Sequence, residues 1–132
     1  MNPLIDTNII SELVRPQPDH KVVKWAGQQT GFFLSVISLE EIHYGLSWKP
    51  NERVNVWITN FLTSYCQLLS VTDTIAKQAG ELRGRLQQQG RTRTQADIVI
   101  AATSLEHGLT LVTRNEKDFE DCGLKLLNPF EA

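Results

Sequence analysis

The chain alternates short apolar runs with longer segments in which apolar residues recur every three or four positions. Periodicity of the second kind predicts amphipathic helices, and short apolar runs bounded by turn residues predict strands. Strands that alternate with helices form parallel sheets through right-handed crossovers, with helices on both faces. The sequence therefore predicts a three-layer α/β/α sandwich whose central parallel sheet has four to five strands, at residues 3–6, 32–36, 68–71, 109–113 and 125–127.

Capping and helix-breaking residues predict where the helices begin and end. Asp19 and Asp73 are predicted N-caps, and Gly90 is predicted to end the helix that Asp73 begins. Ser38 is predicted to begin another helix, with Glu41 three residues later as its capping-box partner. Breaks at residues 15–18 and 49–51 and a polar loop at 91–94 separate the predicted helices, which cover residues 7–14, 19–29, 38–48, 54–65, 73–89 and 96–107.

Composition is that of an ordinary globular protein. The 132 residues suit one domain, 1–132, and 41% of them are hydrophobic and 21% charged. Cys66 and Cys122 lie far apart without a CxxC motif, which predicts reduced thiols in a cytoplasmic protein and argues against structural zinc. No apolar run approaches the roughly 18 residues of a membrane helix, so no membrane association is expected.

Basic residues concentrate in one segment of a chain whose formal charge is −2. Residues 77–95 hold five basic residues and one acid. Such a segment is either a track for phosphates or a solvated helix face, and both interpretations stay open here. The candidate phosphate ligands are Arg83, Arg85, Arg91 and Arg93 of this segment, with Arg114 from a later turn.

Four acids follow strand or turn signals at widely separated places: Asp6, Glu41, Asp97 and Asp118. In an open parallel sheet, ligands bind beyond the carboxyl ends of the strands, so these side chains are expected to meet there. Carboxylate oxygens in a cluster suit Mg²⁺ or Mn²⁺, and without a cation they repel one another. The competing interpretation is that Asp6, Glu41 and Asp97 only cap helices, and periodicity does not choose between Glu40 and Glu41.

The segments that carry these acids resemble the PIN-domain ribonucleases, and among them the VapC and FitB-like toxins of bacterial toxin-antitoxin pairs. The resemblance extends over nearly the whole chain. It lies in the order and spacing of residues 4–8, 35–45, 96–103, 111–115 and 118–119.

The resemblance implies that Asp6, Glu41 and Asp97 are metal-site acids. Its supporting positions are Thr7, Asn8, Ser38, Thr113 and Asn115. Many family members carry aspartate where Asn115 stands, whereas others have asparagine there and an acid three residues later. This chain is similar to the second group, which makes Asp118 the candidate for the fourth acid, and the choice between Asn115 and Asp118 stays open here.

The implied activity is that of a Mg²⁺- or Mn²⁺-dependent endoribonuclease, which cuts RNA by metal-activated water and leaves a 5′-phosphate and a 3′-hydroxyl. The implied partners are a second copy of the chain in a homodimer and a VapB- or FitA-like antitoxin. The C-terminal segment of the antitoxin lies over the active site, and operator DNA is contacted only through the antitoxin. Neither the RNA target nor the number of metal ions follows from the sequence.

Two other functions are weighed against this one. A phosphotransferase with Asp6 as nucleophile would resemble the haloacid dehalogenases, but these carry an acid two positions later, where this chain has Asn8. A FitB-like binding module would act with an antitoxin on operator DNA and have little nuclease activity of its own. Its partner groove would be formed by Tyr44, Trp48, Val54 and Trp57, for which core packing is the alternative.

Overall fold

Five parallel strands form one sheet in the computed structural model, which describes residues 1–131. The strand order is β3-β2-β1-β4-β5, and every neighbouring pair is parallel. The strands are β1 (Leu4–Ile5), β2 (Phe32–Ser35), β3 (Cys66–Leu69), β4 (Thr110–Val112) and β5 (Lys125–Leu127). The predicted parallel sheet is confirmed. Because the first strand lies in the middle, the chain reverses its direction of winding there, and the residue after β1 occupies the switch point where such sheets bind ligands.

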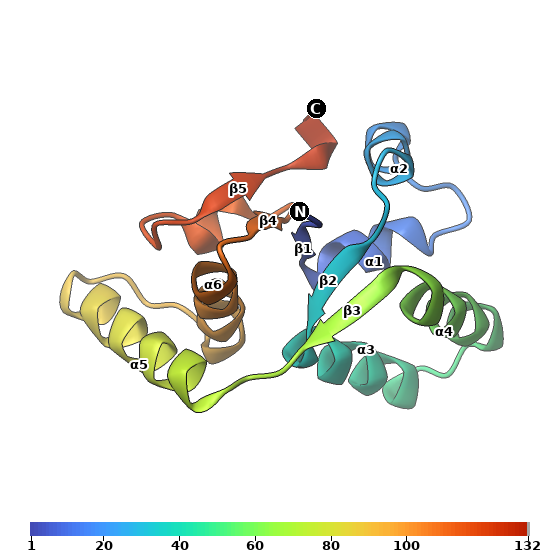
Figure 1. Ribbon diagram of the computed structural model, residues 1–132. Helices are drawn as coiled ribbons and strands as arrows, with labels where there is room; N and C mark the ends of the chain where they lie inside the picture. Colours follow the sequence, from blue (N-terminus) through green and yellow to red (C-terminus); the bar gives the residue numbers. More distant parts are fainter. Residues whose placement is uncertain (132) are drawn as a thin grey trace.

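Helices cover both faces of the sheet (Figure 1). In this view α5 and α6 lie on the left, and α1, α2 and α4 lie on the right, with α3 below β2. The helices are α1 (Thr7–Leu13), α2 (His20–Gly27), α3 (Val36–Trp48), α4 (Glu52–Tyr65), α5 (Asp73–Gln88) and α6 (Gln95–His107), with 3₁₀ turns η1 (Glu116–Phe119) and η2 (Pro129–Glu131).

Successive strand residues point to opposite faces, and this divides the core in two. Leu4 and Leu111 pack with the apolar residues of α5 and α6, whereas Ile5 and Val112 pack with those of α1, α2 and α4. Leu4 and Ile5 of β1 and Leu111 and Val112 of β4 are fully buried, so these side chains contribute only apolar packing. Polar chemistry is therefore displaced to the strand ends.

The predicted starts or N-caps of four helices are wrong by one to three residues, and α4 is one of them, because it begins at Glu52 and not at residue 54. Helix α3 begins at Val36, because Ser35 at the end of β2 accepts a hydrogen bond from Ile37 N (3.1 Å), so Ser38 and Glu41 lie inside the helix and form no capping box. Thr72, and not Asp73, caps α5 by accepting from Ile75 N (3.2 Å). Thr94 caps α6, which starts at Gln95. The third strand also begins earlier than predicted, at Cys66.

The predicted N-cap of α2 and the predicted break between α3 and α4 are confirmed. Asp19 caps α2 by accepting from Lys21 N (2.8 Å). Residues 49–51 separate α3 from α4, with Asn51 as the N-cap of α4. Cys66 and Cys122 are free thiols; burial raises the pKa of Cys66 to about 12 and also raises that of Cys122. Among the described residues, no helix is both long enough and apolar enough to span a bilayer.

Candidate metal centre

Asp6 stands at the centre of the carboxyl edge of the sheet. Its backbone N–H donates to Val112 O (2.9 Å), which continues the ladder between β1 and β4 for one residue. Its carboxylate is only 7% exposed and is held on both oxygens: Oδ1 accepts from Thr7 N (2.8 Å), and Oδ2 accepts from Thr113 Oγ1 (2.9 Å) and Asn8 Nδ2 (3.2 Å). The side chain is therefore fixed in place by the start of α1 and the end of β4.

Thr113 and Asn8 join these two elements. The fully buried Thr113 hydroxyl also accepts from Asn8 Nδ2 (3.3 Å) and Asn115 N (3.1 Å). Asn8 Oδ1 accepts from Arg114 N (3.1 Å). Three of the predicted supporting residues thus form one network around Asp6. Asn8 offers an amide and no proton to a leaving group, which counts against the phosphotransferase interpretation.

Glu41, and not Glu40, is turned toward this edge. Thr7 Oγ1 donates to Glu41 Oε1 (2.8 Å). Thr7, the residue after Asp6, therefore orients the carboxylate of Glu41, which lies on α3. Glu40 instead lines a groove with Arg83 on another side of α3. Gly45, one turn after Glu41, has no heavy atom of residues 1–131 within 4 Å of where a Cβ would stand, apart from its own helix and neighbours. The position of Gly45 therefore leaves open space one turn after Glu41.

Asp97 and Asp118 approach from the other side. Asp97 lies in the first turn of α6, where its N–H donates to Thr94 Oγ1 (3.1 Å) and its carboxylate is half-buried. Asp118 lies in η1 and is exposed. The sequence signal for Thr94 was present but missed, because Thr94-Gln95-Ala96-Asp97 has the spacing of a capping box.

The pKa values show that these carboxylates act on one another. Burial raises the pKa of Asp6, against the lowering effect of its hydrogen bonds, and the charge of Asp118 adds to the rise. Burial also raises the pKa of Asp97; the Thr94 hydroxyl opposes the shift, and the charges of Asp6, Asp118 and Glu41 increase it. Carboxylates from four separate segments are thus within electrostatic reach of one another.

No protein cation neutralises them within residues 1–131. The ion pairs there join Arg15 to Glu12 and Arg91 to Asp121, and neither involves one of the four acids. A cluster of like charges that is partly buried and unpaired is costly unless a cation joins it. The electrostatics of the edge therefore favour binding of a cation from solution.

The donor set fits a hard divalent ion in chemistry, but the side chains do not yet converge on one point. As they stand, no three Asp, Glu, His or Cys side chains in the described part of the chain are arranged to hold a metal ion. Ser38, one turn before Glu41 on α3, is fully buried, and its Oγ has no hydrogen-bond partner among residues 1–131. Such an atom fits a hydrated ion, whose water would satisfy it.

The five candidate phosphate ligands are not equivalent. Arg91 is paired with Asp121, and the Arg114 guanidinium lies over the Phe130 ring at 4.5 Å. Arg93 is half-buried, and its Nε has no hydrogen-bond partner among the described residues. Arg93 and Asp97 both act on the thiol of Cys122, the first lowering its pKa and the second raising it. Arg93 therefore lies on the Asp97 side of the molecule, with its Nε buried and its Nη1 donating to Thr92 O (3.2 Å).

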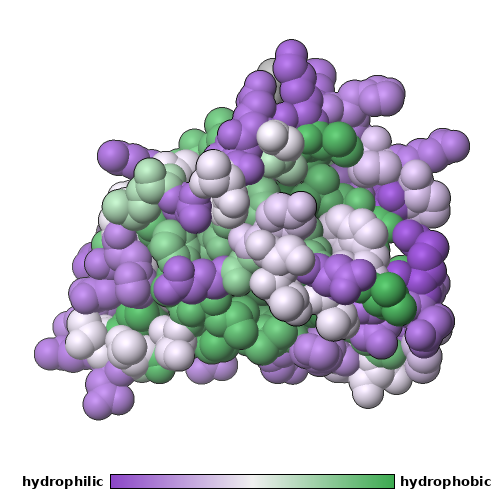
Figure 2. Space-filling view, turned by 45° about the vertical axis from the view of Figure 1, so that its right-hand side comes forward, coloured by the Kyte–Doolittle hydropathy of each residue, from purple (hydrophilic) through white to green (hydrophobic). Residues whose placement is uncertain are grey.

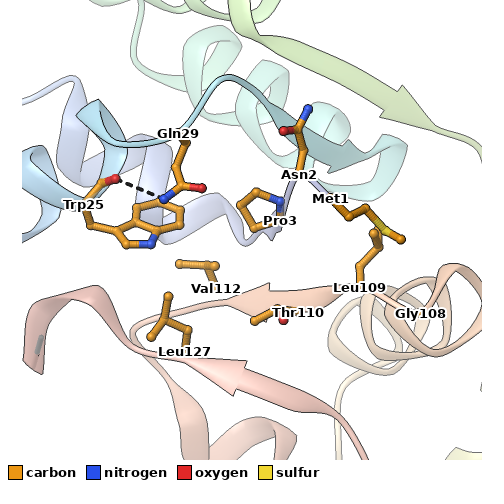
Figure 3. A pocket seen from close by; sticks show the side chains of 10 residues that line it. All are labelled: Met1, Asn2, Pro3, Trp25, Gln29, Gly108, Leu109, Thr110, Val112 and Leu127. Atoms are coloured by element: carbon orange, nitrogen blue, oxygen red, sulfur yellow. Dashed lines mark hydrogen bonds between the residues drawn. The ribbon is translucent and has the colours of Figure 1, made fainter.

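A cavity of about 310 Å³ lies at the opposite end of the strands (Figure 3). Its lining includes Asn2, Pro3, Trp25 and Gln29, and Gln29 Nε2 donates to Trp25 O (3.3 Å). Asn2 and Pro3 precede β1, whereas Asp6 follows it, so the strand separates this cavity from the acids. It offers no carboxylate and is not part of the candidate centre.

Only half of the predicted partner groove is open to solvent. Tyr44 is 63% exposed and Trp48 66% exposed, whereas Val54 and Trp57 are half-buried, with Trp57 stacked on Phe61 at 4.9 Å between ring centroids.

His20, His43 and His107 are all exposed and far apart in the sequence. Histidines therefore contribute nothing that resembles an acid-base pair.

The fold and the site together define a class of protein: a doubly wound α/β protein with a carboxylate cluster at its switch point. The PIN domain family matches residues 4–123, and the chain belongs to that family.

Two named relatives of similar length and one solved structure are similar to this chain. The VapC ribonuclease Y4jK of Sinorhizobium fredii (strain NBRC 101917 / NGR234) is 30% identical over 136 residues, which cover 97% of each chain. Toxin FitB of Neisseria gonorrhoeae is 31% identical over 96% of this chain and 97% of its own. The crystal structure of FitAcB from Neisseria gonorrhoeae superposes with a TM-score of 0.87 at 30% identity, covering 98% of this chain and 99% of that one.

Proposed function

We propose that this PIN-domain protein is a divalent-metal-dependent endoribonuclease and the toxin of a toxin-antitoxin pair. The observation that supports the proposal is that Asp6, Glu41, Asp97 and Asp118 lie within electrostatic reach of one another, with no ion pair to a protein cation among residues 1–131. Relatives of nearly equal length are a VapC ribonuclease and the toxin FitB, and PIN domains are metal-dependent nucleases. Oxygen ligands favour Mg²⁺ or Mn²⁺ over zinc.

In the proposed mechanism the protein positions ligands and substrate. Asp6 and Asp97 are the principal metal ligands, and Glu41 and Asp118 complete the set. Thr113, Asn8 and Thr7 hold Asp6 and Glu41 in fixed orientations, so little side-chain freedom is lost on binding. A bound Mg²⁺ or Mn²⁺ would lower the pKa of water and offset the charge that develops on the phosphodiester.

Arg93 is the proposed main phosphate ligand among the basic residues. Its place on the Asp97 side of Cys122 supports this role, and its Nη1, which donates to Thr92 O (3.2 Å), would turn to the phosphate. Arg83, Arg85 and Arg114 are proposed to add weaker, salt-sensitive attraction. Arg91 would first have to leave Asp121, so its contribution is expected to be the smallest.

The remaining parts of the proposal concern the location of the protein in the cell, its oligomeric state and its partners. Residues 1–132 are proposed to act as one PIN domain in the cytoplasm, as a homodimer that a small antitoxin neutralises. Operator DNA would be reached only through that antitoxin. A short neighbouring reading frame for a DNA-binding protein with a disordered tail is the expected genetic setting.

Cleavage of labelled single-stranded RNA by pure protein tests the activity. We expect cleavage with Mg²⁺ or Mn²⁺ and none in EDTA. Asp97→Asn should reduce cleavage by roughly 100-fold or more, since loss of a ligand should exceed the 10- to 100-fold cost of losing an outer-shell residue. Asp73→Asn is the matched control, because Asp73 is also a first-turn aspartate but lies outside the cluster. Equal cleavage by wild type and Asp97→Asn would contradict the assignment.

The target requires a cellular experiment. The 5′ ends of RNA are mapped after brief expression of the wild type and of Asp6→Asn. Ends that appear only with the wild type identify the cleaved RNA and its sequence. Identical maps from both proteins would argue against Asp6 as a metal ligand.

A further inference from the structure

Two exposed aromatic side chains follow Glu41 along α3. Tyr44 and Trp48 come three and seven residues after Glu41, so all three lie on one side of the helix. The rings are 63% and 66% exposed, with centroids 6.1 Å apart and planes inclined by 34°. Figure 2, which brings the right-hand side of Figure 1 forward, shows apolar side chains in the lower half of this face among polar ones.

Four other aromatic side chains pack in the core. Trp25, Phe32, Phe61 and Trp57 follow one another in ring contacts of 4.9 to 5.8 Å within the core against α1, α2 and α4. Tyr44 and Trp48 belong to neither core cluster. Burial therefore does not explain why this helix carries two large rings on a solvent face.

The surroundings of the pair suit a nucleic acid. Gly45 lies between the two rings in the sequence and leaves open space beside Glu41. Lys49 Nζ lies over the Trp48 ring at 4.7 Å, which places a positive charge at the far end of the pair. A helix rises about 1.5 Å per residue, so the two aromatic positions lie about 4.5 and 10 Å from that of Glu41 along the axis. Those distances correspond to roughly one and three stacked nucleotides.

We propose that Tyr44 and Trp48 are a stacking surface for unpaired RNA bases next to the bond that is cut, with Lys49 facing the backbone phosphates. The inference rests on the proposed function and adds a substrate class to it. Unpaired bases in loops and ends stack on exposed aromatic rings, whereas bases in a duplex are not available. The surface would direct the enzyme to single-stranded RNA and orient the strand along α3.

Binding measured without cleavage tests the proposal directly. A fluorescent single-stranded RNA of about 12 nucleotides is titrated in EDTA against wild type and the double variant Tyr44→Ala, Trp48→Ala. Base stacking contributes about 1–3 kcal/mol per base, so we expect binding at least about fivefold weaker per lost ring. Tyr44→Phe and Trp48→Phe should retain most of the affinity. Val56→Ala, which trims a 49% exposed side chain on α4, is the matched control and should change nothing.

Two further readouts tie the effect to stacking. RNA should quench the fluorescence of the wild type, and Trp48→Phe should remove most of that quenching, because Trp25 and Trp57 are half-buried. Replacing the bases by abasic sites should weaken binding to the wild type but add little to the loss in the double variant. Equal RNA affinity in wild type and double variant overturns the proposal, as does a wild type that binds no single-stranded RNA.

The outcomes separate this proposal from the nuclease assignment. Wild type that binds RNA through the rings but cuts none with either ion supports stacking and contradicts the proposed activity. Wild type that cuts RNA while the double variant binds it unchanged keeps the activity and overturns stacking. A double variant that changes the molar mass of the free protein or its affinity for an antitoxin, with RNA binding unchanged, assigns the rings to a protein interface instead.

Discussion

Asp6 combines burial with strong fixation. Hydrogen bonds to a charged group contribute about 1.5–3 kcal/mol each, and this carboxylate accepts them from Thr7, Asn8 and Thr113. Burial nevertheless raises its pKa, so the hydrogen bonds do not offset the loss of water fully. A residue held in that state is prepared for a cation, which would supply the missing stabilisation without moving the side chain far.

Asp97→Asn is expected to stabilise the metal-free protein. The charges of Asp6, Asp118 and Glu41 act against the ionised Asp97, and the amide removes that repulsion. In EDTA the melting temperature should rise by about 2–5 °C, which corresponds to roughly 1 kcal/mol. The stabilisation that wild type gains from Mn²⁺ should largely disappear. Differential scanning fluorimetry with and without Mn²⁺ measures both effects.

A control variant tests whether the effect depends only on the place of an aspartate in the first turn of a helix. Asp73→Asn removes a first-turn aspartate from α5 without touching the cluster, and it should cost the few tenths of a kcal/mol that helix-dipole interactions contribute. If Asp97→Asn lowers the melting temperature in EDTA as Asp73→Asn does, the four acids do not repel one another as described.

The stabilising effect of Asp97→Asn should depend on pH with a definite sign. The folded-state pKa of Asp97 lies above 3.8, its ordinary value, so the folded wild type holds its proton more tightly than the unfolded chain. Ionisation therefore costs stability as pH rises from the unfolded pKa through the folded one. Below about pH 3.8 the carboxyl is protonated in both states and contributes no such cost. The difference in melting temperature between variant and wild type in EDTA should be near zero at pH 3.5 and largest at pH 7.

At the scale of elements, the alternation of strands and helices was predictable, but several boundaries were not. Val36 is β-branched and apolar, which predicts that it ends the strand; in the structure Ser35 caps a helix that begins at Val36. Thr72 and Asp73 are both good caps, and only the backbone conformation of Thr72 decides between them. Sequence pattern does not contain that information.

The candidate site shows the same division. Topology predicts that Asp6 and Asp97 reach one edge, because both follow from where strands end and helices begin. The choice of Glu41 over Glu40 depends on Thr7, which is 34 residues away in the sequence. The arginines could not be ranked either, since each long side chain is directed by a distant partner, Asp121 for Arg91 and Phe130 for Arg114.

Thr94→Ala is expected to impair activity beyond its cost in stability. Thr94 caps α6 at the turn that carries Asp97, so loss of the cap should cost about 1 kcal/mol and also loosen that carboxylate. Thr72→Ala loses the equivalent cap of α5, at a place remote from the acids in the sequence. The two variants should unfold at similar urea concentrations. RNA cleavage and Mn²⁺ affinity should fall about tenfold in Thr94→Ala only.

A common loss of activity in both cap variants would mean that cleavage follows overall stability. Thr94→Ser restores a hydroxyl at the same backbone position and should recover most of the activity. Failure of that rescue, with α6 intact by circular dichroism, would show that the hydroxyl does not act through Asp97.

At the scale of the whole molecule, a groove of about 530 Å³ runs between α3, α5 and α6. Small and apolar side chains line much of it, including Ala76, Ala79, Gly80 and Val99. Small residues let a second helix approach closely, so we expect the proposed homodimer to form through this groove. No heavy atom of the described residues lies within 4 Å of the place that a Cβ on Gly80 would occupy, apart from the backbone of its own helix and its two chain neighbours. A larger side chain therefore fits the single chain.

Gly80→Arg should therefore convert a dimer into a monomer without unfolding it. Arginine has a better helix propensity than glycine by roughly 0.8–1 kcal/mol, so α5 itself should not weaken. Gly27→Arg places the same side chain in open space at the end of α2 and should leave the wild-type mass unchanged. Light scattering after size-exclusion chromatography gives the three masses. The four acids come from a single chain, so the Gly80→Arg monomer should keep its affinity for Mn²⁺; a dimer that persists in Gly80→Arg would move the interface to another face.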